Sequence, residues 1–101
     1  MRPSERLKEK IEKENLWLFA LSILKSGRMN ARDLRGLVKK RFGFVYGNVT
    51  AYKVLYLLES GNYVKSEKAG KFVFYGITKK GLAELEEAKR LFRKYSAEIA
   101  I

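Results

Sequence analysis

Hydrophobic and polar residues follow one another along this chain with the spacing of helices at both ends. Residues 5–14 are densely charged, and Leu7 and Ile11 recur on one face of the helix that they predict. Residues 16–24 are apolar nearly all round, which indicates a helix at the centre of the core. Ser26-Gly27 is a typical end for that helix.

Two more helices are predicted in the next part of the chain. Asn30 can cap a helix over residues 31–42, in which apolar residues recur at helical spacing. A short connector with a glycine near each end, residues 43–48, leads to a helix over about residues 49–60. Gly61-Asn62 ends this helix, because both residues tolerate a left-handed backbone.

A hairpin and a last helix complete the pattern. Residues 62–68 and 72–77 predict two short strands, the second rich in β-branched and aromatic residues, joined through Gly70. Thr78 can accept hydrogen bonds from the first turn of a helix that runs from Lys79 to roughly Glu98. A helix followed by a hairpin and another helix is the layout of a winged helix-turn-helix.

The fold class that follows is α+β, mostly α. We predict a winged helix-turn-helix with an extra N-terminal helix and a C-terminal dimerisation helix. The expected division is a charged helix at 1–14, a DNA-binding domain at 15–78 and the dimerisation helix at 79–101. A brief strand near Met29 is expected to pair with the hairpin.

Composition narrows the function. Lys and Arg outnumber Asp and Glu by 22 to 11, so the formal charge is +11, which favours a polyanion such as nucleic acid or an anionic membrane surface. A well-solvated basic surface is the plainer alternative. Cys and His are absent, which removes disulfides, thiolate nucleophiles, imidazole bases and the common zinc sites. We therefore expect no enzyme activity, no metal and no cofactor.

The N-terminal region and the apolar run at residues 16–24 indicate where in the cell the protein is expected. The charged N-terminal region lacks a secretory pattern, and residues 16–24 are far shorter than the ~20 residues that span a bilayer. We expect a soluble, cytoplasmic protein without a membrane partner. The absence of Gln and the high charge content also suit a thermophile.

The helix over residues 49–60 divides into two faces at 100° per residue. Its core face comprises Ala51, Val54, Leu55 and Leu58. The opposite face comprises Val49, Thr50, Lys53, Tyr56 and Leu57, and in a helix-turn-helix this face meets the major groove. Lys53 and Thr50 could bind phosphate or base edges, Val49 could contact a thymine methyl, and the Tyr52 hydroxyl could reach a phosphate. The apolar Tyr56 and Leu57 also suit contact with another protein.

The hairpin carries lysines near its tip. Lys65, Lys68 and Lys71 suit contact with phosphates or the minor groove, although lysines on edge strands also protect against aggregation. The candidate DNA-binding residues are Val49, Thr50, Tyr52, Lys53, Tyr56, Lys65, Lys68 and Lys71.

The last helix has an apolar stripe with intervals of three and four residues. It consists of Leu82, Leu85, Ala88, Phe92, Tyr95 and Ile99. Such a stripe is typical of a helix that pairs with another helix, so we predict a homodimer interface. The alternative is that the helix folds back on its own domain.

Three stretches resemble the PadR family of winged-helix transcriptional regulators. Residues 17–27 are similar to its first core helix, and residues 50–59 to its recognition helix, with a tyrosine at Tyr52. Residues 75–81 are similar to its Tyr-x-Leu-Thr-x-x-Gly step from wing to dimerisation helix. The chain departs from the family at Leu34-Arg35-Gly36, where a Gly-Tyr pair is frequent, and in the order Gly61-Asn62.

The resemblance spans about residues 16–92. It implies a dimeric repressor that binds a near-palindromic operator, with Tyr52 and Lys53 on the DNA side. We therefore expect a sequence-specific regulator of transcription that binds double-stranded DNA as a homodimer. A small-molecule effector fits this class, but no residue pattern identifies one. A protein-interaction winged helix and a non-specific architectural DNA-binding protein stay open as alternatives.

Overall fold

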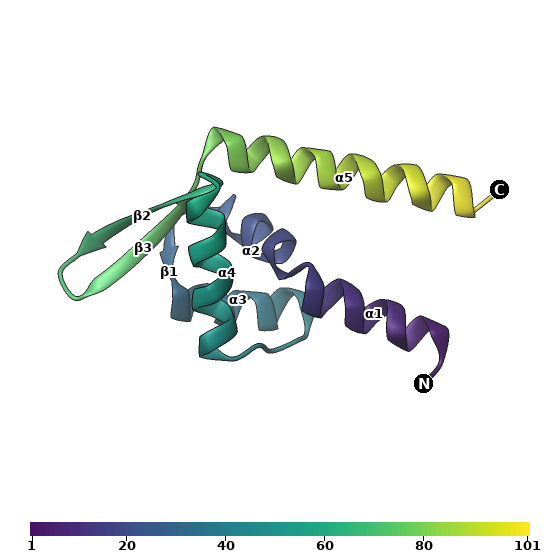
Figure 1. Cartoon of the computed structure of the whole chain (residues 1–101), viewed down its shortest axis with the longest axis horizontal. Helices are drawn as coiled ribbons and strands as arrows, with labels where there is room; N and C mark the ends of the chain where they lie inside the picture. The colour runs from purple at the N-terminus through teal and green to yellow at the C-terminus, as the bar shows by residue number, and fades with distance from the viewer.

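The computed structural model describes residues 1–101 and contains five helices and three strands (Figure 1). In chain order they are α1 (Pro3–Glu14), α2 (Leu16–Leu24), β1 (Met29–Asn30), α3 (Ala31–Phe42), α4 (Asn48–Ser60), β2 (Val64–Ala69), β3 (Phe72–Ile77) and α5 (Lys79–Ile99). This order confirms the α+β, mostly α fold and the short strand near Met29. α1 and α2 are separate helices, because the backbone at Asn15 (φ −125°, ψ 34°) leaves the helical region.

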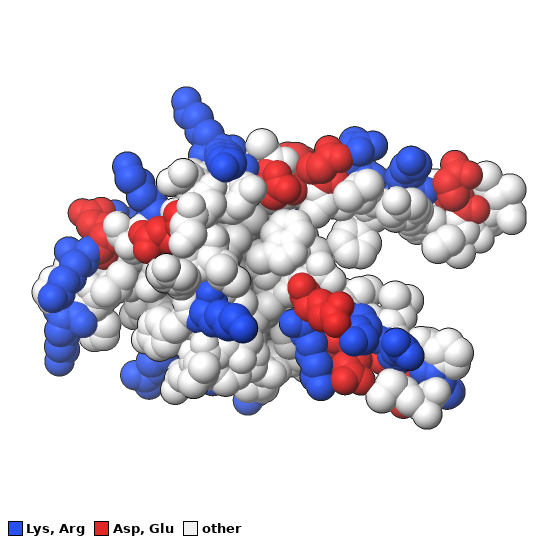
Figure 2. Space-filling view, in the orientation of Figure 1, with Lys and Arg blue, Asp and Glu red and all other residues white.

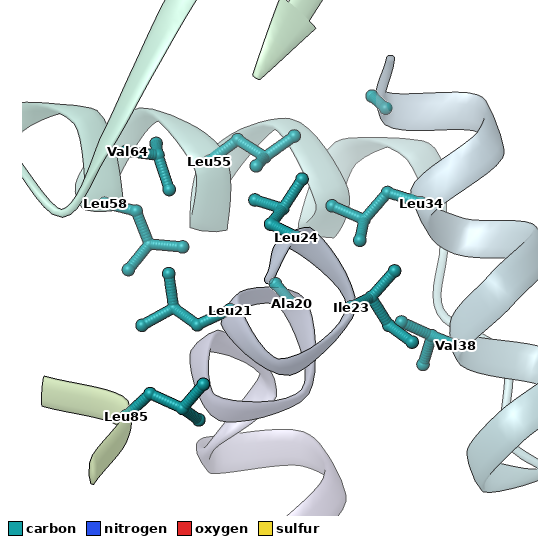
Figure 3. Packing of buried hydrophobic residues seen from close by; sticks show 11 residues of the cluster. Ala20, Leu21, Ile23, Leu24, Leu34, Val38, Leu55, Leu58, Val64 and Leu85 are labelled. Atoms are coloured by element: carbon teal, nitrogen blue, oxygen red, sulfur yellow. The ribbon is translucent and has the colours of Figure 1, made fainter. Parts of the chain in front are cut away.

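α2 lies at the centre of the hydrophobic core. Figure 3 shows its side chains among those of α3, α4, β2 and α5, and Leu21 and Leu24 are 0% and 1% exposed. Burying one leucine stabilises a fold by about 1.5–3 kcal/mol. Because α2 is apolar nearly all round, it can pack against every other layer at once. The core cluster comprises Ala20, Leu21, Ile23, Leu24, Ala31, Leu34, Val38, Leu55, Leu58, Val64 and Leu85.

The strands form an antiparallel sheet in the order β1-β3-β2. β2 and β3 pair along their whole length, from Val64↔Ile77 to Ala69↔Phe72, whereas β1 pairs with only two residues of β3. Gly70 (φ 63°) supplies the left-handed residue of the hairpin turn. The β2–β3 hairpin, hereafter the wing, therefore projects from the domain at the left of Figure 1, with its turn at the outer end.

The wing joins α4 and α5 at a small junction. Asn62 has a left-handed backbone (φ 64°) just after α4, as expected for a helix end. The Thr78 N–H donates to the Tyr63 carbonyl (3.1 Å), and the Thr78 hydroxyl donates to the Asn62 carbonyl (2.6 Å). The same hydroxyl oxygen accepts from the Gly81 N–H (3.0 Å), which confirms the predicted cap of α5. These bonds connect the end of α4, the base of the wing and the start of α5.

The connector between α3 and α4 is held from two sides. Arg35 Nε donates to the Tyr46 carbonyl (2.9 Å), and Arg35 Nη1 donates to Asn48 Oδ1. The ring of Phe44 lies edge-on against Phe19 of α2, with 5.0 Å between centroids. Burial raises the pKa of Tyr46 to about 12, although the Arg35 charge opposes the increase. These contacts position the first residue of α4.

α1 and the outer half of α5 extend beyond the core. Figure 1 shows both helices on the same side of the molecule, opposite the wing, and the molecule measures 52 × 30 × 22 Å. No residue of α1 is buried. In α5, Leu85 and Ala88 are buried in the chain's own core, whereas every residue from Arg90 onward is exposed. We call α1 and the exposed part of α5 the two arms.

Substitution of Gly81 tests the junction. A Cβ at Gly81 would lie 2.2 Å from the Tyr63 carbonyl oxygen, so Gly81→Ala is expected to lower the free energy of unfolding by about 1–3 kcal/mol. Urea unfolding measures this change. Gly36→Ala is the matched control, since open space surrounds that helical glycine and the substitution is expected to add up to about 1 kcal/mol. Equal effects of the two substitutions would contradict the steric explanation.

The raised pKa of Tyr46 predicts a pH-dependent stability. The unfolded chain releases the phenol proton near pH 10, before the folded chain does, so this stabilisation is complete below pH 10 and is lost as pH rises toward 12. Because the side chain is only half-buried, we expect a loss of about 1 kcal/mol. Denaturant unfolding at pH 9 to 12 should show a shallower decline for Tyr46→Phe than for the unchanged protein. Parallel declines would refute the assignment.

Candidate nucleic-acid interface

α4 presents one face to solvent along its whole length. Val49, Tyr52 and Tyr56 are 84%, 58% and 69% exposed, and Thr50 and Lys53 lie on the same open side. The opposite face packs on α2 through Ala51, Leu55 and Leu58. The helical periodicity of the sequence therefore predicted the two faces of α4 correctly.

The first turn of α4 adds donors to this face. The N-cap position is Gly47, which has no side chain to accept a hydrogen bond from the helix. The first N–H groups of a helix have no partner within the helix and form the positive end of its dipole. Val49 and Thr50 are exposed there, beside Asn48, whose side-chain oxygen accepts a hydrogen bond from Arg35. This end of α4 is suited to an anion such as a backbone phosphate.

The wing carries cations from its base to its turn: Lys65 lies near the base, opposite Gly76, whereas Lys68 and Lys71 lie next to the turn. Lys65, Lys68 and Lys71 are exposed, and Figure 2 shows Lys and Arg side chains along the hairpin and over α4 in one view. Phe72 is 50% exposed at the tip, with Lys71 Nζ 5.9 Å from the centre of its ring. A polyanion that touches the wing in this orientation also faces α4.

Charge is distributed unevenly along the chain. Residues 15–83 contain 13 of the 22 basic residues but only three of the 11 acidic ones. The other acidic residues lie in α1 and α5, where most form ion pairs within one helix, such as Lys10–Glu14 (2.9 Å) and Arg90–Glu87 (2.5 Å). The excess of positive charge is therefore concentrated on the helix-turn-helix and the wing.

The seam between α4 and the wing holds several polar side chains. Burial raises the pKa of Tyr75, and the nearby Glu59 and Tyr52 raise it further. Tyr52, predicted to lie between the two faces of α4, is therefore on the wing side of the helix.

Two arginines near this surface were missed by sequence reasoning. Arg28, just before β1, pairs with Glu67 of the wing (2.6 Å) and lies 5.7 Å from the ring centre of Phe74. Arg35 holds Asn48 and the connector. The partner of Arg28 lies 39 residues away, so no local signal could have identified the pair. For the contact between Arg35 and Asn48, the available signal was that Asn48 is a polar residue at the start of the predicted recognition helix.

The predicted dimer stripe divides into two parts. Leu85 and Ala88 are buried inside the protomer, where a partner cannot reach them, because the first half of α5 packs on α2. Leu82 is half-buried, while Phe92, Tyr95 and Ile99 are 50%, 57% and 85% exposed. A groove of about 310 Å³ between α2 and α5 is lined by Trp17, Leu18, Leu91, Phe92 and Tyr95. The outer half of the stripe is thus the part available to a partner.

The acidic side chains of this protein do not gather into a metal site. No group of three acidic, histidine or cysteine side chains is placed to hold a metal ion. None of the helices combines the length and the hydropathy that crossing a bilayer requires.

Comparison with known proteins bears on the fold. No protein-family model and no curated protein matches this chain. Among solved structures, a PadR-like transcription factor from Bacteroides fragilis is 18% identical, with a TM-score of 0.79 over 94% of this chain and 96% of that one. A PadR family transcription regulator from Clostridium difficile is 23% identical, with a TM-score of 0.77 over 83% and 93% of the two chains.

A third similar structure is a winged-helix DNA-binding protein from STIV. It is 23% identical, with a TM-score of 0.71 over 82% of this chain and 91% of that one. Each of these likenesses covers more than four fifths of this chain. The chain has the winged-helix fold.

Proposed function

We propose that this protein is a sequence-specific regulator of transcription that binds double-stranded DNA as a homodimer and acts as a repressor. The observation that carries the proposal is the exposed face of α4, with Lys53 at its centre, beside a wing that bears three exposed lysines. The concentration of positive charge on residues 15–83 supports it. The similarity to solved regulators of transcription is consistent with it.

In this proposal each part of the interface has a separate task. The start of α4 enters the major groove, where Lys53 and Thr50 bind base edges or phosphates and Val49 contacts a thymine methyl. Tyr52 and Tyr56 reach the backbone beside the groove. Lys65, Lys68 and Lys71 bind the flanking phosphates or minor groove. A bound dimer would exclude polymerase from the site.

The homodimer is proposed from the arms. Phe92, Tyr95 and Ile99 form an apolar strip that is exposed on the α5 arm, and the groove beside Trp17 continues this strip toward the core. A second copy of α5 would cover it. Residues 79–101 would then serve dimerisation, and the two α4 helices would enter half-sites about one helical turn apart.

Two other functions rest on specific observations. Tyr56 and Leu57 are 69% and 58% exposed on α4, which suits a surface that binds another protein. The formal charge of +11 suits a non-specific architectural protein. Selection of sites from a random duplex pool separates them: an enriched inverted repeat supports the repressor, tight binding without enrichment supports the architectural protein, and no binding supports the protein-interaction module.

Lys53→Ala tests direct contact with bases. We expect the variant to lose about 1–3 kcal/mol of discrimination between the selected site and random DNA, because a base-edge contact is removed. Fluorescence anisotropy at fixed salt measures both affinities. Lys8→Ala, which removes the same charge from α1, should leave the discrimination unchanged. An equal loss on both DNAs for Lys53→Ala would mean that Lys53 binds only phosphate.

Phe92→Glu tests the dimer. A carboxylate in the centre of the apolar strip would be buried without a partner, so we expect monomers in sedimentation equilibrium and DNA binding weaker by at least about tenfold. Lys94→Glu, on the same arm but outside the strip, is the control. A dimer that survives Phe92→Glu would locate the interface elsewhere.

A further inference from the structure

A single carboxylate joins α4 to the wing. Ser66, in the middle of β2, donates from its N–H to Glu59 Oε2 (2.9 Å), and its hydroxyl donates to the same oxygen. Glu59 lies in the last turn of α4 and is partly buried. Ser66 pairs with Tyr75 across the hairpin, so the carboxylate lies at the seam where the wing leaves the domain.

Glu59 lies where a negative charge is unfavourable, and its hydrogen bonds with Ser66 offset this cost. Glu59 forms no ion pair, although six of the other acidic residues pair within α1 or α5. A negative charge near the C-terminus of a helix opposes the helix dipole. It also repels a polyanion that lies across α4 and the wing. The two hydrogen bonds to an ionised acceptor are the compensating interaction, and such bonds are about twice as strong as neutral ones.

The other edge of the hairpin is supported by β1, where Met29 and Asn30 pair with Tyr75 and Phe74 of β3. Arg28, just before β1, also pairs with Glu67 of β2, but both side chains are more than half exposed, and exposed pairs of this kind contribute little to stability. On the β2 edge, the hydrogen bonds between Glu59 and Ser66 are the side-chain link between α4 and the wing, so they act directly on the angle between the two.

We propose that Glu59 is a positioning residue that holds the wing at the angle at which the wing lysines and the α4 face reach one duplex together. This inference rests on the proposed DNA binding and adds a determinant that does not itself touch DNA. Without the hydrogen bonds between Glu59 and Ser66 the wing would swing, so that α4 and the wing lysines would no longer bind as one unit.

The wing angle can be measured without DNA. The chain lacks cysteine, so Ser60→Cys and Ala69→Cys allow two spin labels to be placed on α4 and at the wing tip. We expect a narrow distance distribution in the otherwise unchanged protein and a clearly broader one after Glu59→Ala. An equally narrow distribution after Glu59→Ala would overturn the inference, whatever the protein binds.

Affinity for DNA is an independent measure, because Glu59→Ala and a control loss of one carboxylate are expected to change it in opposite directions. Removing a carboxylate makes the protein more basic, so Glu87→Ala on α5, a matched loss of one carboxylate, is expected to leave binding to the selected site unchanged or tighter. Glu59→Ala is expected to weaken it, and to reduce the slope of log affinity against log salt by about 0.9 for each phosphate that the wing no longer binds. Tighter binding after Glu59→Ala would overturn the inference.

Combining Glu59→Ala with substitutions of the wing lysines tests whether Glu59 affects DNA binding through the wing. In a protein that already carries Lys65→Ala, Lys68→Ala and Lys71→Ala, adding Glu59→Ala should change affinity by less than about twofold, because the side chains that it positions are gone. Glu59→Gln keeps an oxygen that accepts from the Ser66 N–H and should restore most of the binding by the wing. Ser66→Ala removes the hydroxyl on the other side and should weaken binding less than Glu59→Ala. A full, additive loss in the background without the three wing lysines would refute the role.

DNA binding by this protein and the positioning role of Glu59 can be refuted separately. If no duplex is selected from the random pool, the proposed function fails, while the spin-label distances still decide whether Glu59 holds the wing. If a site is selected and Glu59→Ala binds it with unchanged affinity and salt slope, DNA binding stands and the positioning role fails.

Discussion

The Tyr63 carbonyl accepts a hydrogen bond from the Thr78 N–H, and the arrangement of the whole surface depends on this contact. Tyr63 lies just beyond Gly61-Asn62 at the end of α4, and its own N–H donates to the Leu58 carbonyl of that helix. Thr78 ends the hairpin and caps α5. One backbone bond thus joins α4, the wing and α5. Gly81 permits this approach, because any side chain there would meet the Tyr63 oxygen.

Much of the fold was predictable because its signals are local. The caps at Asn30 and Thr78 depend on a side chain and an N–H three residues later, and both caps are present. The all-round apolar character of residues 16–24 predicted the central helix α2. The break at Asn15 could not be decided in advance, since a charged helix can continue into an apolar one without any change of local signal.

The sequence predicted which side of α4 is exposed, but not the contacts that hold α4 and the wing in place. Helical spacing identified the exposed side of α4, because burial in a helix follows its period. The contacts Arg28–Glu67 and Glu59–Ser66 join residues that only the folded chain brings together. The apolar stripe of α5 shows a different limit. Its spacing indicates that some surface covers it, but not which one, and Leu85 and Ala88 pack on their own core while Phe92 and Tyr95 do not.

The paired charges of α1 and α5 have a consequence for how this molecule meets a partner. Residues 15–83 carry almost all of the surplus positive charge and the two arms are nearly balanced, so the charge is placed off-centre along a molecule whose longest extent is 52 Å. In the field of a polyanion such a body experiences a torque that turns the wing end forward before any atom touches. Random tumbling is thereby biased toward productive collisions, and the screening of this bias within a Debye length of ~8 Å at physiological salt confines it to the final approach.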